Sequence, residues 1–187
     1  MRAPPIASID IEPSQRDLYD AFVNRIRTNY SGLKAIRSDG ALLGPWSVWI
    51  NVPETGAAIR QLTESVGAMP GLSKVAVQAV TLVTVAHFNA AYELYVHAAL
   101  GAQAGLSSEQ VATLAAGDIP ANLDPETAVA VRVANTLLRG GVLPGPLYSH
   151  AVERLGRDGF NRVVFLVGVY CLVSVTLGAF DVPSEDQ

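Results

Sequence analysis

The chain has 187 residues, of which 50% are hydrophobic and only 16% are charged, with a formal net charge of −4. Globular proteins usually carry about a quarter charged residues, so this composition indicates either a membrane protein or a subunit that covers much of its surface in an oligomer. The sequence has no basic cluster and no alternation of basic and aromatic residues, which argues against a nucleic-acid partner.

Helical patterns follow one another along almost the whole chain, and strand signals are poor. Helix starts are indicated by a potential N-cap at Ser73, by a capping-box pattern at Ser107 and Gln110, and by Pro53 in a first turn. The expected helices cover residues 14–30, 53–66, 74–88, 90–104, 107–117, 124–140, 144–155 and 159–178. The sequence therefore predicts an all-α protein.

Two of these helices contain long runs without charge, at Val75–Tyr92 and Val163–Phe180. The second run reaches the lower length limit of a membrane-spanning helix, about 17–18 residues. Small and polar residues interrupt both runs, and the flanking charges are few and mixed, without the positive-inside pattern. We therefore favour buried helices over membrane spans, because a helix that is apolar all round belongs in the core of a bundle or an oligomer.

The N-terminal residues and the cysteine content indicate where the protein resides. Residues 1–13 lack the cationic start and apolar core of a signal peptide. Cys171 is the single cysteine, so neither an intrachain disulfide nor a C-x-x-C motif is possible. We expect a cytoplasmic protein in which Cys171 is a small buried hydrophobic residue.

Glu93 and His97 are the strongest candidates for chemistry. They lie four residues apart in a region with few other charges, so on a helix both side chains leave the same face. A carboxylate at this distance can orient the imidazole and support its protonated form, which makes an acid/base pair. The alternative is an ordinary helix contact, worth only about 0.2–0.5 kcal/mol.

The residues around this pair resemble the carboxymuconolactone decarboxylase family, which includes the AhpD-like alkylhydroperoxidases. The resemblance rests on the run AAYELYVHAALGAQAGLS at residues 90–107, on Leu43-Gly44-Pro45-Trp46 with Pro53-Glu54 upstream, and on Gly168-Val169-Tyr170 followed by Ala179–Pro183. It covers about residues 42–183. It implies a single-domain, all-α, AhpD-like bundle over residues 42–187 with an N-terminal helical extension over 1–41, assembled as a homo-oligomer (dimer, trimer or hexamer).

The chain departs from the peroxidase branch of that family, which uses C-x-x-C-x-x-x-H with an upstream glutamate. Aligned on His97, the two cysteine positions hold Ala90 and Glu93, and the glutamate position holds Gln78. A dithiol cycle needs one thiol to attack and one to resolve, so peroxidase activity is not expected. Residual peroxidase activity that uses Cys171 is a hypothesis only to be tested.

The resemblance then points to the decarboxylase branch, with a Glu-x-x-x-His pair in a cofactor-free site and no metal. It implies a lyase or isomerase, with a small unsaturated or lactone-like carboxylic acid as substrate, in which His97 delivers a proton at carbon and Glu93 supports it. The rival is a non-catalytic binding or assembly subunit. It is favoured by the missing carboxylate at Gln78 and by the lack of an obvious arginine in the central helices; the available arginines are Arg60, Arg132, Arg139 and Arg162.

Five further residues are candidates for binding the substrate, each with a structural alternative: His87, Asn89, Tyr92, Trp46 and Tyr170. His87 either lies at the pocket or is a structural histidine whose ring nitrogens are hydrogen-bonded within the fold. Asn89 either forms a hydrogen bond with Glu93 or the substrate, or caps the start of a helix. The aromatic residues either line the pocket or pack in the core.

Overall fold

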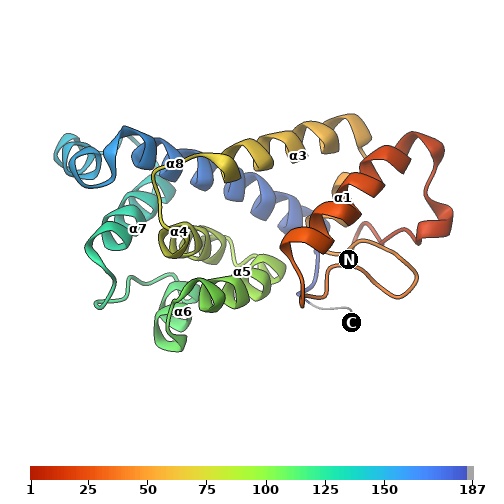
Figure 1. The fold of residues 1–187 in the computed structure, drawn as a ribbon, viewed down its shortest axis with the longest axis horizontal. Coiled ribbons are helices and arrows are strands. Elements are labelled where there is room, and N and C mark those ends of the chain that lie inside the picture. The colour runs from red at the N-terminus through yellow and green to blue at the C-terminus, as the bar shows by residue number, and fades with distance from the viewer. Residues whose placement is uncertain (185–187) are drawn as a thin grey trace.

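Helices make up most of the protein in the computed structural model, which describes residues 1–184 (Figure 1). The α-helices are α1 Arg16–Asn29, α2 Pro45–Trp49, α3 Pro53–Ala68, α4 Lys74–His87, α5 Ala91–Ala104, α6 Ser108–Ala115, α7 Pro125–Leu138 and α8 Gly145–Phe180. Two single 3-10 turns, Ser8–Asp10 and Pro13–Gln15, precede α1. In the described part of the chain the β-structure is limited to one isolated bridge, between Ile36 and Leu42. The predicted all-α class is confirmed.

Side-chain caps set the starts of α4 and α6 where the sequence predicts them. The Ser73 hydroxyl accepts a hydrogen bond from the backbone N–H of Ala76 at 3.1 Å. Ser107 and Gln110 form the reciprocal capping box, in which each side chain accepts from the other residue's backbone N–H. These bonds satisfy N–H groups that the first turn of a helix leaves without partners.

The core is built around α4, which packs against α5, α6, α7 and α8. Its middle, residues 79–85, is buried on every side. A helix between several neighbours must be apolar all round, which is why this uncharged run is buried in the protein. The prediction of a buried helix here is confirmed.

A single break interrupts α8, the longest helix. Gly156 has φ 68° and ψ 173°, outside the helical region, and helical residues lie on both sides of it. Two separate helices were expected here, 144–155 and 159–178. In the structure they form one helix, in which Gly156 alone has non-helical backbone angles. The predicted start at Gly159 instead marks a close approach: a Cβ there would lie 2.4 Å from the carbonyl oxygen of Gly71.

The outward face of α8 carries an exposed apolar stripe, which differs from the buried helix that the sequence suggested. Phe165, Gly168, Leu172, Val175 and Ala179 are exposed at alternating intervals of four and three residues. Among residues 1–184, α8 alone has the length and composition to cross a membrane, and 39% of its most apolar 18-residue window is buried. Heptad-like spacing of this kind is typical of a helix that packs against another helix.

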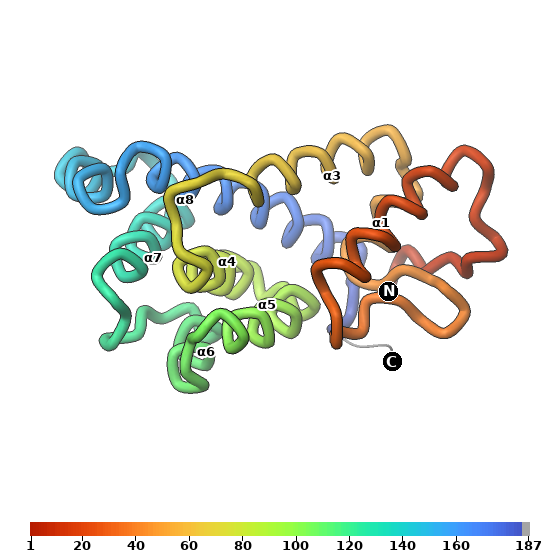
Figure 2. The backbone as a smooth tube through the Cα atoms, in the orientation of Figure 1, coloured from red at the N-terminus to blue at the C-terminus, as the bar shows by residue number. Residues whose placement is uncertain are grey.

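The N-terminal segment lies at one end of the molecule, across the ends of α3 and α8 (Figure 2). Phe22 of α1 is fully buried, and its ring centroid lies 6.2 Å from that of Trp49. The backbone N–H of Arg2 donates to the Phe180 carbonyl at 2.7 Å, which joins the start of the chain to the end of α8. The division into an extension and a domain near residue 41 remains a prediction, but α1 contributes directly to the site described next.

Candidate active site

Six helices, α1 to α5 and α8, surround a cavity of about 570 Å³. Its polar lining consists of Arg25, Asn29, Tyr30, Thr63, Glu64, Lys74, Gln78, Glu93, His97 and Tyr170. Its apolar lining includes Trp46, Trp49, Val96, Leu100, Leu166 and Val173. The volume suits a small organic molecule, because ligand pockets usually measure about 300–1,000 Å³.

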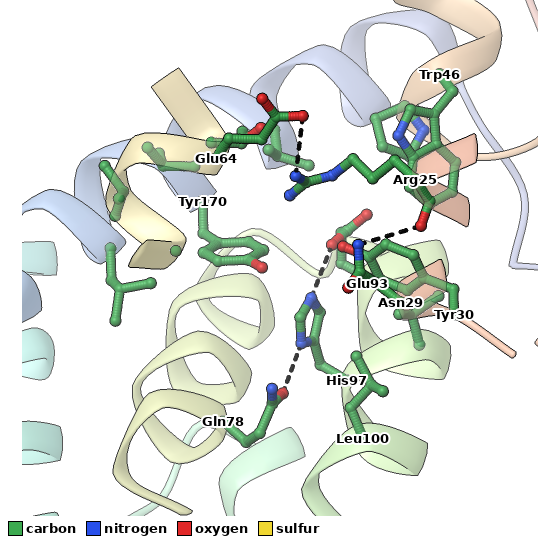
Figure 3. Close-up of a pocket in the computed structure, with 18 of the residues that line it drawn as sticks. Arg25, Asn29, Tyr30, Trp46, Glu64, Gln78, Glu93, His97, Leu100 and Tyr170 are labelled. Carbon is green, nitrogen blue, oxygen red and sulfur yellow. Dashed lines mark hydrogen bonds and ion pairs between the residues drawn. The ribbon is translucent and has the colours of Figure 1, made fainter. Parts of the chain in front are cut away.

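Glu93, His97 and Gln78 form a chain of contacts in the wall of this cavity (Figure 3). The Glu93 Oε2 atom lies 3.2 Å from His97 Nε2, and His97 Nδ1 lies 2.8 Å from Gln78 Oε1. Glu93 is 5% exposed and His97 is 3% exposed. The pair therefore combines the expected helical spacing with nearly complete burial, and α4 supplies the third member.

The contacts of the His97 ring fix its orientation. Both ring nitrogens face oxygen atoms, Nε2 toward Glu93 and Nδ1 toward Gln78. A glutamine side chain offers both an acceptor oxygen and a donor NH₂ group, so Gln78 can hold Nδ1 whether or not that nitrogen carries a proton. Gln78 thus orients His97 in either state.

Aromatic side chains enclose the pair. The Tyr170 ring stands edge-on to His97, with centroids 4.9 Å apart and an interplanar angle of 88°. Burial raises the pKa of the Tyr170 phenol well above its usual range. Burial also raises the pKa of Tyr30, which Arg25 partly opposes and Glu93 reinforces. Both phenols are therefore neutral hydroxyl groups at physiological pH.

Arg25, from α1, lies over the cavity on the side away from Gln78 (Figure 3). Its guanidinium Nη1 is 3.4 Å from Glu64 Oε1, an ion-pair distance longer than a normal hydrogen bond. Arg60, one turn before Glu64 on α3, donates to both Glu64 oxygens at 2.8 Å. Glu64 is thus held mainly by Arg60, and its contact with Arg25 is the weaker one.

Four of the sequence-predicted residues line this cavity: Glu93, His97, Trp46 and Tyr170. His87 and Asn89 do not, and this corrects the prediction for both. His87 is the exposed last residue of α4. Asn89 is exposed in the turn that follows, with φ 50°, so it does not precede Glu93 by one turn of the same helix.

Tyr92 is also placed elsewhere, although it neighbours Glu93 in sequence. Its hydroxyl donates to the Lys34 carbonyl at 3.2 Å, and its ring packs so closely on Gly44 that a Cβ there would lie 2.2 Å from the ring. Adjacent residues on a helix point about 100° apart, so Tyr92 faces the N-terminal segment while Glu93 faces the cavity. The packing alternative applies to Tyr92.

Arg25, Tyr30 and Glu64 also line the cavity, and none of them was predicted from the sequence. None has a local signal, because each lies on a different segment from Glu93 and reaches the cavity only through packing. The arginines considered there, Arg60, Arg132, Arg139 and Arg162, do not line this cavity. Cys171 does not line it either; the thiol is half-buried, and burial raises its pKa.

No family model matches the sequence, and no curated protein matches it significantly. Solved structures that share the fold include two of the debrominase Bmp8. A cysteine-to-alanine variant bound to 2,3,4-tribromopyrrole has a TM-score of 0.73 and 11% identity, covering 99% of this chain and 92% of that chain. The apo form has a TM-score of 0.73 and 10% identity, covering 98% and 91%.

The chain has the AhpD-like fold of this debrominase. This confirms the all-α, AhpD-like architecture that the sequence predicts. At such low identity the likeness concerns the fold alone, and the chemistry must be argued from the site.

Proposed function

We propose that the protein is a cofactor-independent lyase or isomerase that moves a proton at a carbon atom of a small unsaturated or lactone-like carboxylic acid. Decarboxylation is the lead reaction. The observation that carries this proposal is the buried Glu93–His97 pair in the wall of a cavity, with Gln78 orienting the ring. Acid–base pairs that catalyse proton transfer need this combination of burial, contact and access to a ligand.

The proposed reaction balances without a further reagent. The bond between the carboxylate carbon and the ring carbon breaks, and its electron pair enters the unsaturated lactone as an enolate while CO₂ leaves. The enolate then accepts one proton at carbon from the enzyme, which recovers it from water. Tyr30 and Tyr170 are neutral donors that can hold an enolate oxygen.

The contacts in the cavity refine the roles within the pair. Both nitrogens of His97 are engaged, whereas Glu93 contacts His97 only through Oε2, and no hydrogen bond to Oε1 exists among the described residues. We therefore assign the direct exchange with substrate to Glu93 and the supply of the proton to His97. Such a pair acts as a unit, so loss of either member disables both.

The shared fold supports a small ring as the ligand. The debrominase structure holds 2,3,4-tribromopyrrole, a small planar ring. In this chain the single cysteine lies outside the cavity, so we propose proton transfer by Glu93 and His97 and no thiol chemistry.

The test follows CO₂ release from a panel of unsaturated lactone acids. Glu93→Gln and His97→Gln keep the approximate shape and should each lower turnover by ~10²–10⁴-fold, while Cys171→Ala, outside the cavity, should stay within a few-fold of wild type. Circular dichroism controls for folding. Turnover that survives both substitutions would place the chemistry elsewhere, and turnover lost in Cys171→Ala would restore the thiol hypothesis.

The rival function, a non-catalytic binding subunit, predicts a different outcome in the same experiment. Such a subunit binds members of the panel and releases no CO₂ from any of them. One of the two sequence arguments for the rival was the lack of an obvious arginine in the central helices; the other was Gln78 in place of a carboxylate. Arg25, from α1, lines the cavity and supplies the cation that the first argument found missing.

A further inference from the structure

We infer that Arg25, supported by Tyr30, is the subsite that binds a carboxylate of the ligand. The inference deepens the proposed function, because it names the residue that selects an anionic ligand and the end of the cavity where its charge lies. It rests on the contacts of Arg25, on the unpartnered indole N–H of Trp49 in the cavity and on the position of Glu93.

Arg25 is available for a ligand. Its ion-pair partner, Glu64, lies at 3.4 Å, whereas Arg60 donates to both Glu64 oxygens at 2.8 Å. Glu64 therefore keeps a strong partner when Arg25 turns to a ligand. A guanidinium carries five donors and binds a carboxylate through two parallel hydrogen bonds. The long contact to Glu64 and the interaction with the Tyr30 side chain leave most of this capacity unused.

The cavity also holds a buried donor without a partner. Trp49 lines the cavity, is 5% exposed, and its indole Nε1–H has no hydrogen-bond partner among the described residues. The Tyr30 phenol, which interacts with Arg25, is kept neutral by burial and remains a donor. A buried donor without a partner is uncommon in folded proteins, and an oxygen atom of a ligand in the cavity would satisfy the one on Trp49.

The chemistry of decarboxylation restricts which carboxylate Arg25 holds. A carboxylate loses its charge as it becomes CO₂, so a cation bound to it would stabilise the ground state more than the transition state. Arg25 therefore binds a carboxylate that stays on the ligand throughout the reaction. The reacting carbon then lies toward Glu93 and His97, on the other side of the cavity.

The test is a binding experiment that requires no turnover. The chain has two tryptophans, Trp46 and Trp49, and both line the cavity, so intrinsic fluorescence reports its occupancy. The probes are a butenolide ring with an acetic acid arm and the methyl ester of the same compound. The ester keeps nearly the same shape without the charge.

Wild type should bind the acid more tightly than the ester. Arg25→Gln should weaken binding of the acid by about 10- to 100-fold, the usual range for loss of hydrogen bonds to a charged group, and leave the ester unchanged. Glu64→Gln should strengthen binding of the acid, because it removes the competing carboxylate. Arg27→Gln is the matched control: it removes an equal charge from an exposed residue of α1 that does not line the cavity, and it should have little effect.

Three results would overturn the inference: no preference for the acid in wild type, an unchanged affinity in Arg25→Gln, or an equal loss in Arg27→Gln. The outcome is separable from that of the proposed function. A protein that binds the acid through Arg25 but turns over no substrate supports the subsite and contradicts the lyase.

Discussion

Removal of one member of the Glu93–His97 pair should destabilise the protein far more than loss of a surface helix contact. When the His97 ring is protonated, it lies 3.2 Å from an opposite charge, and such a pair attracts by about 5 kcal/mol for an effective dielectric constant of about 20. Desolvation offsets much of this attraction, so the intact pair is worth little net free energy. Loss of one partner leaves the other buried and unpaired, which costs about 3–5 kcal/mol.

A double-mutant cycle measures this coupling without any knowledge of the substrate. We expect Glu93→Gln and His97→Gln each to lower the free energy of unfolding by a few kcal/mol. The double variant, in which two neutral amides face each other, should recover part of the loss. The coupling free energy should be about 1–3 kcal/mol, the range found for residues in direct contact. Urea unfolding followed by circular dichroism provides the four values.

Arg60 and Glu64 provide the matched control on α3. They have the same i, i+4 spacing, but their side chains are 27% and 39% exposed, compared with 4% and 7% for His97 and Glu93. Their coupling should be about 0.3–0.5 kcal/mol. If the Glu93–His97 coupling is no larger than that of the control pair, the pair is an ordinary helix contact and the reasoning for an active site fails.

Three further predictions concern other parts of the molecule. Gln78→Leu should lower turnover about tenfold, which is a part of the ~10²–10⁴-fold value of positioned proton transfer. Gln78→Glu still accepts from Nδ1 and should keep most of the wild-type turnover. Equal turnover in Gln78→Leu and wild type would show that Gln78 does not orient the ring. Gly159→Ala should lower the free energy of unfolding by about 1–3 kcal/mol, because the new Cβ would meet the Gly71 carbonyl. Gly178→Ala has open space around it and should raise the free energy of unfolding by about 0.5–1 kcal/mol. If thermal unfolding shows Gly159→Ala to be the more stable variant, the close approach at Gly159 is contradicted. The exposed stripe of α8 should make the protein a homo-oligomer in detergent-free buffer, which Val175→Glu dissociates; light scattering that shows a wild-type monomer, or a requirement for detergent, would refute this.

The sequence alone was sufficient for features that depend on residues near one another in the chain. The starts of α4 and α6 follow from Ser73 and Ser107, because a cap acts on N–H groups two or three residues away. The shared face of Glu93 and His97 follows from helical geometry. The uncharged run of α4 correctly predicted its burial, whereas the equally uncharged run of α8 leaves one face exposed. The resemblance to the AhpD-like family added the long-range order of these helices, which local patterns do not contain.

Only the tertiary structure shows which distant residues meet at the site. Arg25 belongs to α1, sixty-eight positions before Glu93, and reaches the cavity because α1 packs against α3 and the Trp49 segment. His87 and Asn89 are near Glu93 in sequence, yet the turn between α4 and α5 directs them to solvent. Contacts of this kind depend on the packing of whole helices, where a rotation of a few tens of degrees decides which side chains face a cavity. The sequence around each residue does not determine that rotation.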